Sequence, residues 1–332
     1  MGQGKQLISV IVPAYGCSAT LGRCLEGLFG SAHRDFECIV VDDASPDDFS
    51  ALLKPFPVKL LKLEKRSGPA FARNRGAEAA AGEILFFLDS DVRPRPETLG
   101  LVAAFFEKHA DVSAVFGSYD DEPGEPGFLS QYRNLFHHYT HQVSREKAMT
   151  FWAGCGAVRK EAFRSVGGFD EHYTRPCVED IALGYRLNRA GYEVRLEKTI
   201  QATHLKRWTF VGILRSDIFD RALPWTALLM RQEKLANDLN ITVAARVGTL
   251  GLYAGIACLA AAVVWPLVAI PGLLLVAGVI LLNGSVYGFY LRKRGLWFAL
   301  RAIPMHLLYL FYGGLAFAAG SALYKLGFRK DG

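Results

Sequence analysis

The stretch Ser67–Val92 reads SGPAFARNRGAEAAAGEILFFLDSDV and decides the fold. Its small-residue part, Pro69–Ala81, predicts a helix. The apolar run Ile84–Leu88 that follows predicts a buried strand, which leads directly into the acidic triplet Asp89-Ser90-Asp91. A helix that leads into a buried strand is typical of an α/β protein, in which ligands bind outside the carboxyl ends of the strands.

The same alternation extends on both sides of this stretch. Before it, the sequence predicts strands at Leu7–Pro13, Phe36–Val41 and Val58–Leu63 and a helix at Thr20–Phe29. After it, the sequence predicts strands at Phe151–Val158 and Tyr192–Leu196 and helices at Phe128–Gln142, Lys160–Val166 and Glu179–Ala190. Strands and helices at this spacing predict a parallel doubly wound sheet.

The end of the chain has a different composition. The 332 residues have a mean hydropathy of +0.17, which is high for a purely soluble protein. Val247–Leu291 and Ala302–Tyr324 contain no Asp, Glu, Lys or Arg. One membrane span needs ~20 residues, so the first run predicts two spans and the second run a third. We therefore expect a transmembrane region over residues 241–332.

The basic residues near these runs suggest an orientation. Arg246 and Arg292-Lys293-Arg294 would both face the cytoplasm, as the positive-inside rule requires. The tail with Lys325, Arg329 and Lys330 would then lie on the far side, against the rule, so the topology of the last segment stays open. Because much of the excess behind the net charge of +6 flanks the apolar tail, we expect a membrane partner and no nucleic acid.

The segment between the two parts mixes charge with large apolar side chains. Residues 206–240 include Trp208, Trp225, Arg215 and Arg221. This composition predicts amphipathic helices that lie in the membrane interface. The alternative is a helix that packs on the soluble domain.

Three acidic pairs follow or begin predicted elements. Asp89 and Asp91 suit Mg²⁺ or Mn²⁺, because these cations take one or two carboxylates together with substrate phosphates; the alternative is a solvated turn. Asp42-Asp43 follows a strand and suits a nucleotide, or Asp42 only caps a turn. Glu179-Asp180 opens a helix, where the helix dipole keeps a carboxylate ionised. A general base must be ionised, so the pair suits that role. The alternative is that the pair only stabilises the end of the helix.

Five segments, taken together, carry a family resemblance. They are ISVIVPAYG, VVDDASPD, SGPAFARNRGAEAAAGEILFFLDSDV, GCGAVRKEAFRSVGGFDE and VEDIALGYRLNRAGYEV. They resemble the inverting family-2 glycosyltransferases of GT-A fold over residues 1–205, in the order that the family has them. The resemblance implies a Rossmann-like mixed sheet and a nucleotide-diphosphate sugar donor, with UDP-sugars favoured.

The resemblance also implies roles for individual residues. The nucleotide side of the donor site corresponds to Pro13, Ala14, Tyr15, Asp42, Asp43 and Ser90. The metal would be held by Asp89 and Asp91, of which Asp91 is the expected direct ligand. Asp180 would be the general base, with Glu179 beside it.

Four further residues are candidates with open alternatives. His204 could be a third metal ligand or a phosphate donor, or a surface histidine. Arg207-Trp208 resembles the R-W end of a motif in membrane synthases, in which Arg meets the pyrophosphate and Trp stacks on the acceptor, but the Gln of that motif is missing here. Arg73 could touch the diphosphate or have a surface role.

We expect a metal-dependent enzyme of the cell membrane that crosses it several times, with a cytoplasmic catalytic domain. Its acceptor would be a hydroxyl of a membrane lipid or lipid-linked saccharide. The alternatives are a polyprenyl-phosphate sugar transferase, a small polysaccharide synthase and a non-catalytic scaffold. The sequence leaves a homo-oligomer open.

Overall fold

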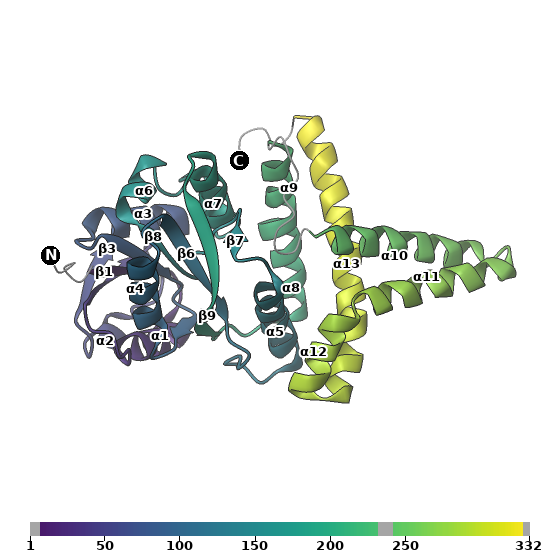
Figure 1. The fold of residues 1–332 in the computed structure, drawn as a ribbon, viewed down its shortest axis with the longest axis horizontal. Coiled ribbons are helices and arrows are strands. Elements are labelled where there is room, and N and C mark those ends of the chain that lie inside the picture. Colours follow the sequence, from purple (N-terminus) through teal and green to yellow (C-terminus); the bar gives the residue numbers. More distant parts are fainter. Residues whose placement is uncertain (1–6, 232–241, 328–332) are drawn as a thin grey trace. The chain divides into compact units, whose positions relative to one another are not determined.

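The computed structural model describes residues 7–231 and 242–327. The chain divides into two compact units, Met1–Trp208 (unit 1) and Thr209–Gly332 (unit 2), and we describe each by itself (Figure 1). Residues 206–208, which the sequence places at the start of the amphipathic segment, lie in unit 1. Part of that segment, residues 232–240, falls outside the described residues.

Unit 1 is built on a nine-stranded mixed sheet, counted over the residues described. The strand order is β3-β2-β1-β4-β8-β6-β9-β5, and β7 pairs with β9. In chain order the strands are Ile8–Ala14 (β1), Phe36–Asp42 (β2), Val58–Lys62 (β3), Ile84–Leu88 (β4), Val92–Pro94 (β5), Val112–Tyr119 (β6), Lys147–Ala148 (β7), Cys155–Arg159 (β8) and Glu193–His204 (β9).

The first half of the sheet is parallel and the second half is mixed. β3, β2, β1 and β4 run in the same direction, whereas β8 is antiparallel to both β4 and β6. The mixed α/β sheet is therefore confirmed. The carboxyl ends of β1, β2 and β4 meet at one edge, which brings the residues after Ala14, Asp42 and Leu88 together.

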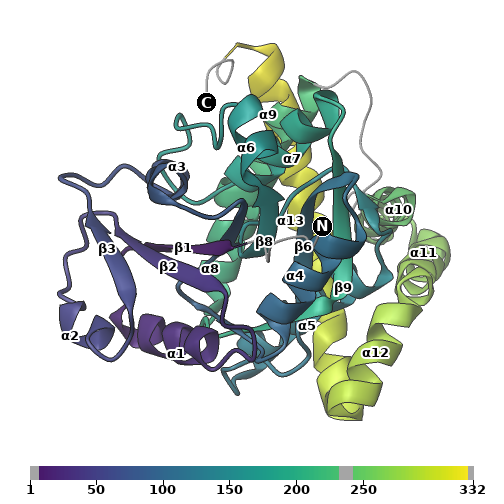
Figure 2. The same cartoon turned by 60° about the vertical axis from the view of Figure 1, so that its left-hand side comes forward.

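Helices cover both faces of the sheet because its central strands are apolar on both faces. All five residues of β4 are buried, for example. The helices of unit 1 are Ser18–Phe29 (α1), Ser50–Leu53 (α2), Pro69–Ala79 (α3), Thr98–Lys108 (α4), Phe128–Val143 (α5), Lys160–Ser165 (α6) and Glu179–Arg189 (α7). Helices α1 and α3 lie on opposite sides of β1 and β2, as right-handed crossovers require (Figure 2).

Two strand predictions differ from the structure by more than one residue at an end. The strand predicted at Phe151–Val158 begins only at Cys155, because Phe151–Gly154 forms irregular backbone that packs against α7. The strand predicted at Tyr192–Leu196 extends to His204, because it pairs with β6 and then with β5.

Unit 2 is helical over the residues described. Phe210–Arg215 (α8), the π-helical segment Ser216–Ala222 (η1) and Leu223–Met230 (α9) form one continuous helical stretch. The remaining elements are Val243–Ala261 (α10), the short 3₁₀ turn Pro266–Val268 (η2), Ala269–Leu282 (α11), Gly284–Arg294 (α12) and Leu296–Lys325 (α13). Helices α10 and α11 form an antiparallel pair (Figure 1).

The apolar helices agree only in part with three predicted spans. Among the described residues, α10 and α13 are each long and apolar enough to cross a membrane. The remaining candidate, Pro266–Arg294, is bent by 59° between Leu282 and Gly284, so the count is two spans, or three if this pair is one span. At the bend, the side chain of Asn283 donates to the carbonyl of Val279, a bond that competes with regular helix.

We predict that Gly184→Ala destabilises unit 1. Gly184 lies on α7, and an added Cβ would overlap the backbone of Thr150 and Phe151, which cannot rotate away as a side chain can. Overpacking of this kind costs ~1–3 kcal/mol. Gly100→Ala on α4 is the control, because nothing lies near its Cβ position.

Thermal unfolding of the full-length protein in detergent measures both variants. Gly184→Ala is expected to melt well below the parent and Gly100→Ala at or above it, since alanine favours a helix. Equal melting temperatures for the two variants would show that α7 does not pack closely on residues 150–151.

Candidate active site

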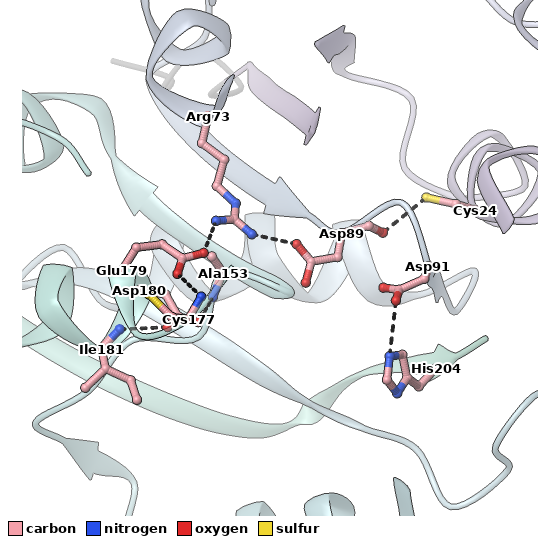
Figure 3. Close-up of polar contacts among 10 residues, drawn as sticks. All are labelled: Cys24, Arg73, Asp89, Asp91, Ala153, Cys177, Glu179, Asp180, Ile181 and His204. Carbon is pink, nitrogen blue, oxygen red and sulfur yellow. Dashed lines mark hydrogen bonds and ion pairs between the residues drawn. The ribbon is translucent and has the colours of Figure 1, made fainter. Parts of the chain in front are cut away.

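The acidic triplet after β4 lies at the carboxyl edge of the sheet, part-exposed. The carboxylate of Asp89 accepts a hydrogen bond from Arg73 Nη2 at 2.7 Å (Figure 3). The backbone N–H of Asp89 donates to the carbonyl of Gly154. Burial raises the pKa of Asp89, although Arg73 opposes the rise. The triplet is therefore tied both to α3, through Arg73, and to the segment before β8.

Arg73 connects the two acidic motifs. Its Nη1 donates to Glu179 Oε1 at 2.8 Å while its Nη2 pairs with Asp89 (Figure 3). The residue is only 4% exposed. The alternative of a surface role is therefore wrong, because this guanidinium is buried between two carboxylates. Its position gives the Asp89-Ser90-Asp91 and Glu179-Asp180 motifs a common centre.

Glu179 and Asp180 have different surroundings. Glu179 is buried, and its second oxygen accepts from the N–H of Cys177 at 2.8 Å, so both of its oxygens are engaged. Asp180 is half-buried and accepts from the N–H of Ala153 at 3.2 Å and from the N–H of Ile181 at 2.8 Å (Figure 3). Burial, together with repulsion by Glu179, raises the pKa of Asp180 to about 7. A carboxyl with such a pKa is able to both accept and release a proton near neutral pH.

Asp91 lies beside His204, on the side of Asp89 that is opposite to Arg73. The distance from His204 Nε2 to Asp91 Oδ2 is 3.5 Å. Burial opposes ionisation of Asp91, but attraction to His204 and Lys206 outweighs it and lowers the pKa of this carboxyl. His204 is buried and stacks on Tyr119 with ring centres 4.3 Å apart. The alternative of a surface histidine is therefore wrong.

The arrangement of these side chains shows whether they fit a divalent cation. Among the residues described, no three His, Cys, Asp or Glu side chains converge closely enough to hold a metal by themselves. Mg²⁺ and Mn²⁺ commonly take one or two carboxylates and complete their shell with substrate phosphates and water. Asp91 with His204, and Asp89 nearby, fit a cation of that kind.

The residues expected at the nucleotide lie where β1 and β2 end. Tyr15 is exposed, and the guanidinium of Arg66 lies 3.9 Å from its ring centre, whereas Pro13 and Ala14 are largely covered. Asp42 accepts from the N–H of Ser45 and so caps a turn, which was the alternative for this residue.

Asp43 organises the loop before α3. Its two carboxylate oxygens accept from the N–H groups of Ser67 at 2.6 Å and Gly68 at 2.8 Å. Gly68 has a φ of 94°, and a Cβ there would overlap the backbone of Thr174, so only glycine fits. Asp43 thereby places the amino end of the helix that carries Arg73.

Ser90, Arg207 and Trp208 complete the expected set. Burial raises the pKa of the Cys17 thiol, and the side chain of Ser90 opposes the rise. Arg207 is exposed, but Trp208 is buried and its backbone N–H donates to Ser130 on α5. The structure thus places Trp208 in the interior of unit 1, whereas the sequence suggested an interfacial or acceptor-stacking position.

Two groups in this site carry no signal in the sequence. The N–H of Ala153 contacts Asp180 from irregular backbone, which any residue except proline could supply. Asn134 on α5 accepts from His204, but a single asparagine in an amphipathic helix looks like an ordinary polar position. A local pattern reveals neither of them.

Comparison with known proteins adds the family context. Residues 9–167 match the sequence model described as glycosyl transferase family 2, and residues 133–207 match one described as the N-terminal domain of galactosyltransferase. An uncharacterized glycosyltransferase of Haemophilus influenzae is 29% identical over 167 residues, which cover 49% of this chain and 56% of that protein. Validoxylamine A glucosyltransferase of Streptomyces hygroscopicus subsp. jinggangensis is 28% identical over 235 residues, covering 60% and 56%. The chain thus spans little more than half the length of these relatives.

Solved structures share the fold. The mannosyltransferase PcManGT from Pyrobaculum calidifontis, in complex with GDP-Man and Mn²⁺, superposes with a TM-score of 0.58 at 19% sequence identity. The match covers 96% of this chain and 87% of that protein. At this identity the likeness establishes the GT-A fold and no more.

We predict that Asp180→Asn stabilises the folded protein at neutral pH. An unfolded aspartate has a pKa near ~3.9, so a folded pKa of about 7 means that folding disfavours the ionised form. This penalty is absent below the unfolded pKa, grows as the pH rises, and is complete above the folded pKa. Asparagine cannot ionise and avoids it.

Melting temperatures of the full-length protein at about pH 8 and about pH 5 test this sign. Asp180→Asn is expected to gain more over the parent at the higher pH. The control is Asp111→Asn, which removes a carboxylate whose side chain is 72% exposed. A gain for Asp180→Asn that is equal at both pH values would argue against the raised pKa.

Proposed function

Because the chain carries a glycosyltransferase family 2 domain of GT-A fold, we propose that it transfers a sugar from a nucleotide-diphosphate sugar to a hydroxyl group, with inversion at the anomeric carbon. The observation that carries the proposal is that Arg73 forms two ion pairs, one with Asp89 and one with Glu179. It brings the expected donor-side and acceptor-side carboxylates into one cluster, although Arg73 and Glu179 are 106 residues apart.

The donor would lie at the carboxyl edge of the sheet. Tyr15, Asp43 and the backbone around Pro13 and Ala14 would surround the nucleotide, and Ser90 would lie beside the diphosphate. A uridine nucleotide is favoured by the family resemblance alone. The mannosyltransferase of similar fold was solved with GDP-Man, so a guanosine donor belongs among the candidates.

Asp91, His204 and Asp89 would hold Mg²⁺ or Mn²⁺ next to the diphosphate. When bound, the cation would neutralise the charge that develops on the leaving nucleotide. The lowered pKa of Asp91 suits this role, because a metal ligand must be deprotonated.

Asp180 would act as the general base. It takes the proton of the acceptor hydroxyl, whose oxygen forms a bond to the anomeric carbon as the bond from that carbon to the diphosphate oxygen breaks on the opposite face. The sugar configuration inverts, the nucleoside diphosphate leaves, and the proton stays on Asp180. Glu179 has both oxygens engaged, so it serves to hold Arg73 and to raise the pKa of its neighbour.

The acceptor would be a membrane lipid or lipid-linked saccharide, with the catalytic domain at the cytoplasmic face of the cell membrane. Two or three apolar helices of unit 2 support a membrane location. The α8–η1 stretch also presents Val211 (71% exposed), Arg215 and Phe219 (50% exposed) at intervals of four residues. A basic residue between exposed apolar side chains on one helix face suits the interface between lipid and water.

We predict that transfer requires a divalent cation through Asp91. Full-length protein in detergent would be incubated with Mn²⁺ and a panel of UDP-, GDP- and dTDP-sugars, and nucleotide release measured with and without added lipid extract. Chelator should abolish transfer, and Mn²⁺ should restore it. Asp91→Asn should lower the rate about 10²-fold or more, roughly 2.7 kcal/mol of barrier, whereas Asp111→Asn should not. Undiminished transfer by the parent in chelator would remove the metal from the proposal.

We predict that Asp180→Asn binds donor but loses transfer by about 10²–10⁴-fold, because asparagine keeps the shape and cannot take a proton. In the parent, only ionised Asp180 is a base. The value of kcat/KM should therefore rise with pH and level off above the pKa of about 7.

The pH profile of lipid-dependent nucleotide release measures this. If Asp180→Asn keeps the parent rate, no general base is needed at this position. The acceptor would then already be a nucleophile, as in a polyprenyl-phosphate sugar transferase.

A further inference from the structure

We infer that Asn134 and Trp208 are positioning residues that fix the ring of His204 with Nε2 toward Asp91, ready to bind a divalent cation. The inference rests on the metal site in the proposed function. Its basis is a chain of hydrogen bonds. Trp208 Nε1 lies 3.3 Å from Asn134 Oδ1, and the same oxygen lies 2.6 Å from His204 Nδ1.

The chain of hydrogen bonds determines which ring nitrogen carries the proton. The indole N–H of Trp208 can only donate, so the atom of Asn134 that it meets must be the amide oxygen. That oxygen can only accept, so the proton in its bond with His204 lies on Nδ1. When His204 is neutral, rather than in the protonated form that attracts Asp91, its lone pair therefore lies on Nε2, the nitrogen 3.5 Å from Asp91 Oδ2. Figure 3 shows this nitrogen directed at the Asp91 carboxylate.

Packing keeps the three side chains in place. Asn134 is 1% exposed and His204 6% exposed. The His204 ring stacks nearly parallel on Tyr119, with 9° between the two planes. The backbone N–H of Trp208 donates to Ser130 Oγ at 2.8 Å, one turn before Asn134 on α5. The ring therefore has little freedom to flip and exchange its two nitrogens.

These hydrogen bonds resemble those that neighbouring residues make to a metal-binding histidine. A histidine that binds a metal usually donates its other ring N–H to an oxygen, which fixes the tautomer and makes the ligating nitrogen more basic. Asn134 supplies that oxygen. Trp208 orients Asn134, because in the alternative amide rotamer the indole N–H would face the amide NH₂ group, which cannot accept from it. The indole N–H of Trp208 is thus used inside unit 1.

Binding of Mn²⁺ in the presence of a saturating nucleoside diphosphate tests the inference without turnover. Full-length protein would be titrated, with free Mn²⁺ followed by electron paramagnetic resonance. Asn134→Leu keeps the size and loses the acceptor, so Mn²⁺ should bind about 10–100-fold more weakly. Asn134→Asp keeps an oxygen acceptor for both donors and should bind Mn²⁺ at least as tightly as the parent.

Ser130→Ala is the matched control. It removes a hydrogen bond between the same helix and the same tryptophan without touching His204 or Asn134. Its Mn²⁺ affinity should equal that of the parent. An equal loss in Ser130→Ala and Asn134→Leu would mean that α5 matters only for packing, and would overturn the inference.

The tautomer can also be observed without any metal. Nitrogen-15 NMR of histidine-labelled protein, at a pH where the histidines are neutral, distinguishes the two tautomers, and His204→Gln identifies the signal among the eight histidines. The parent should show the proton on Nδ1 of His204. In Asn134→Leu, His204 should lose this preference for one tautomer. In Trp208→Phe, His204 should be a mixture of the two tautomers. A proton on Nε2 in the parent, or an unchanged tautomer in either variant, would overturn the inference.

The two readouts separate this inference from the proposed function. If Mn²⁺ binds equally well to the parent and to Asn134→Leu but not to Asp91→Asn, the inference fails and the metal site stands. If the parent binds no Mn²⁺ with any of the nucleoside diphosphates, the metal site fails and the inference fails with it.

Discussion

The buried guanidinium of Arg73 is the interaction on which the site depends. It forms ion pairs with Asp89 at 2.7 Å and Glu179 at 2.8 Å, from two motifs far apart in the chain. A buried charge without a partner costs several kcal/mol, so the three side chains are stable only together. Asp180 adjoins this cluster and bears an unfavourable charge of its own, which is the physical origin of its raised pKa.

Backbone N–H groups also hold carboxylates of the site, and this links the site to the fold. Asp43 accepts from residues 67 and 68, Glu179 from residue 177, and Asp180 from residue 153. Each donor lies in a turn or loop between regular elements, where N–H groups are not used by a ladder or helix. The irregular segment before β8 is an example: the strand starts late, and the N–H of Ala153 remains available for Asp180. Close packing of Gly184 on residues 150–151 brings α7 within reach of that group.

Unit 2 illustrates a different constraint. Its helices expose large apolar side chains such as Val263, Leu267 and Leu281. Soluble proteins rarely expose large continuous apolar surfaces to water. The bend at Asn283 interrupts a run that contains no charged residue, because backbone and side-chain geometry decide where a helix is continuous. Hydropathy therefore predicts the membrane character of this region better than it predicts the number of spans.

The sequence by itself determined most strands and helices of unit 1, the acidic triplet after β4 and the acidic pair that begins α7. It did not predict β6 and α4, nor the short elements β5, β7 and α2. These features are local: an apolar run, a helical period or adjacent carboxylates can be recognised within about ten residues. What the sequence could not predict are the partners. It offered a diphosphate contact or a surface role for Arg73, did not single out Asn134, and suggested an interfacial position for Trp208. Only tertiary structure decided these, because His204 and Asn134 meet across 70 residues and Arg73 and Glu179 across 106. Contacts of that kind arise from the order and direction of strands in the mixed sheet, which no short stretch of sequence encodes.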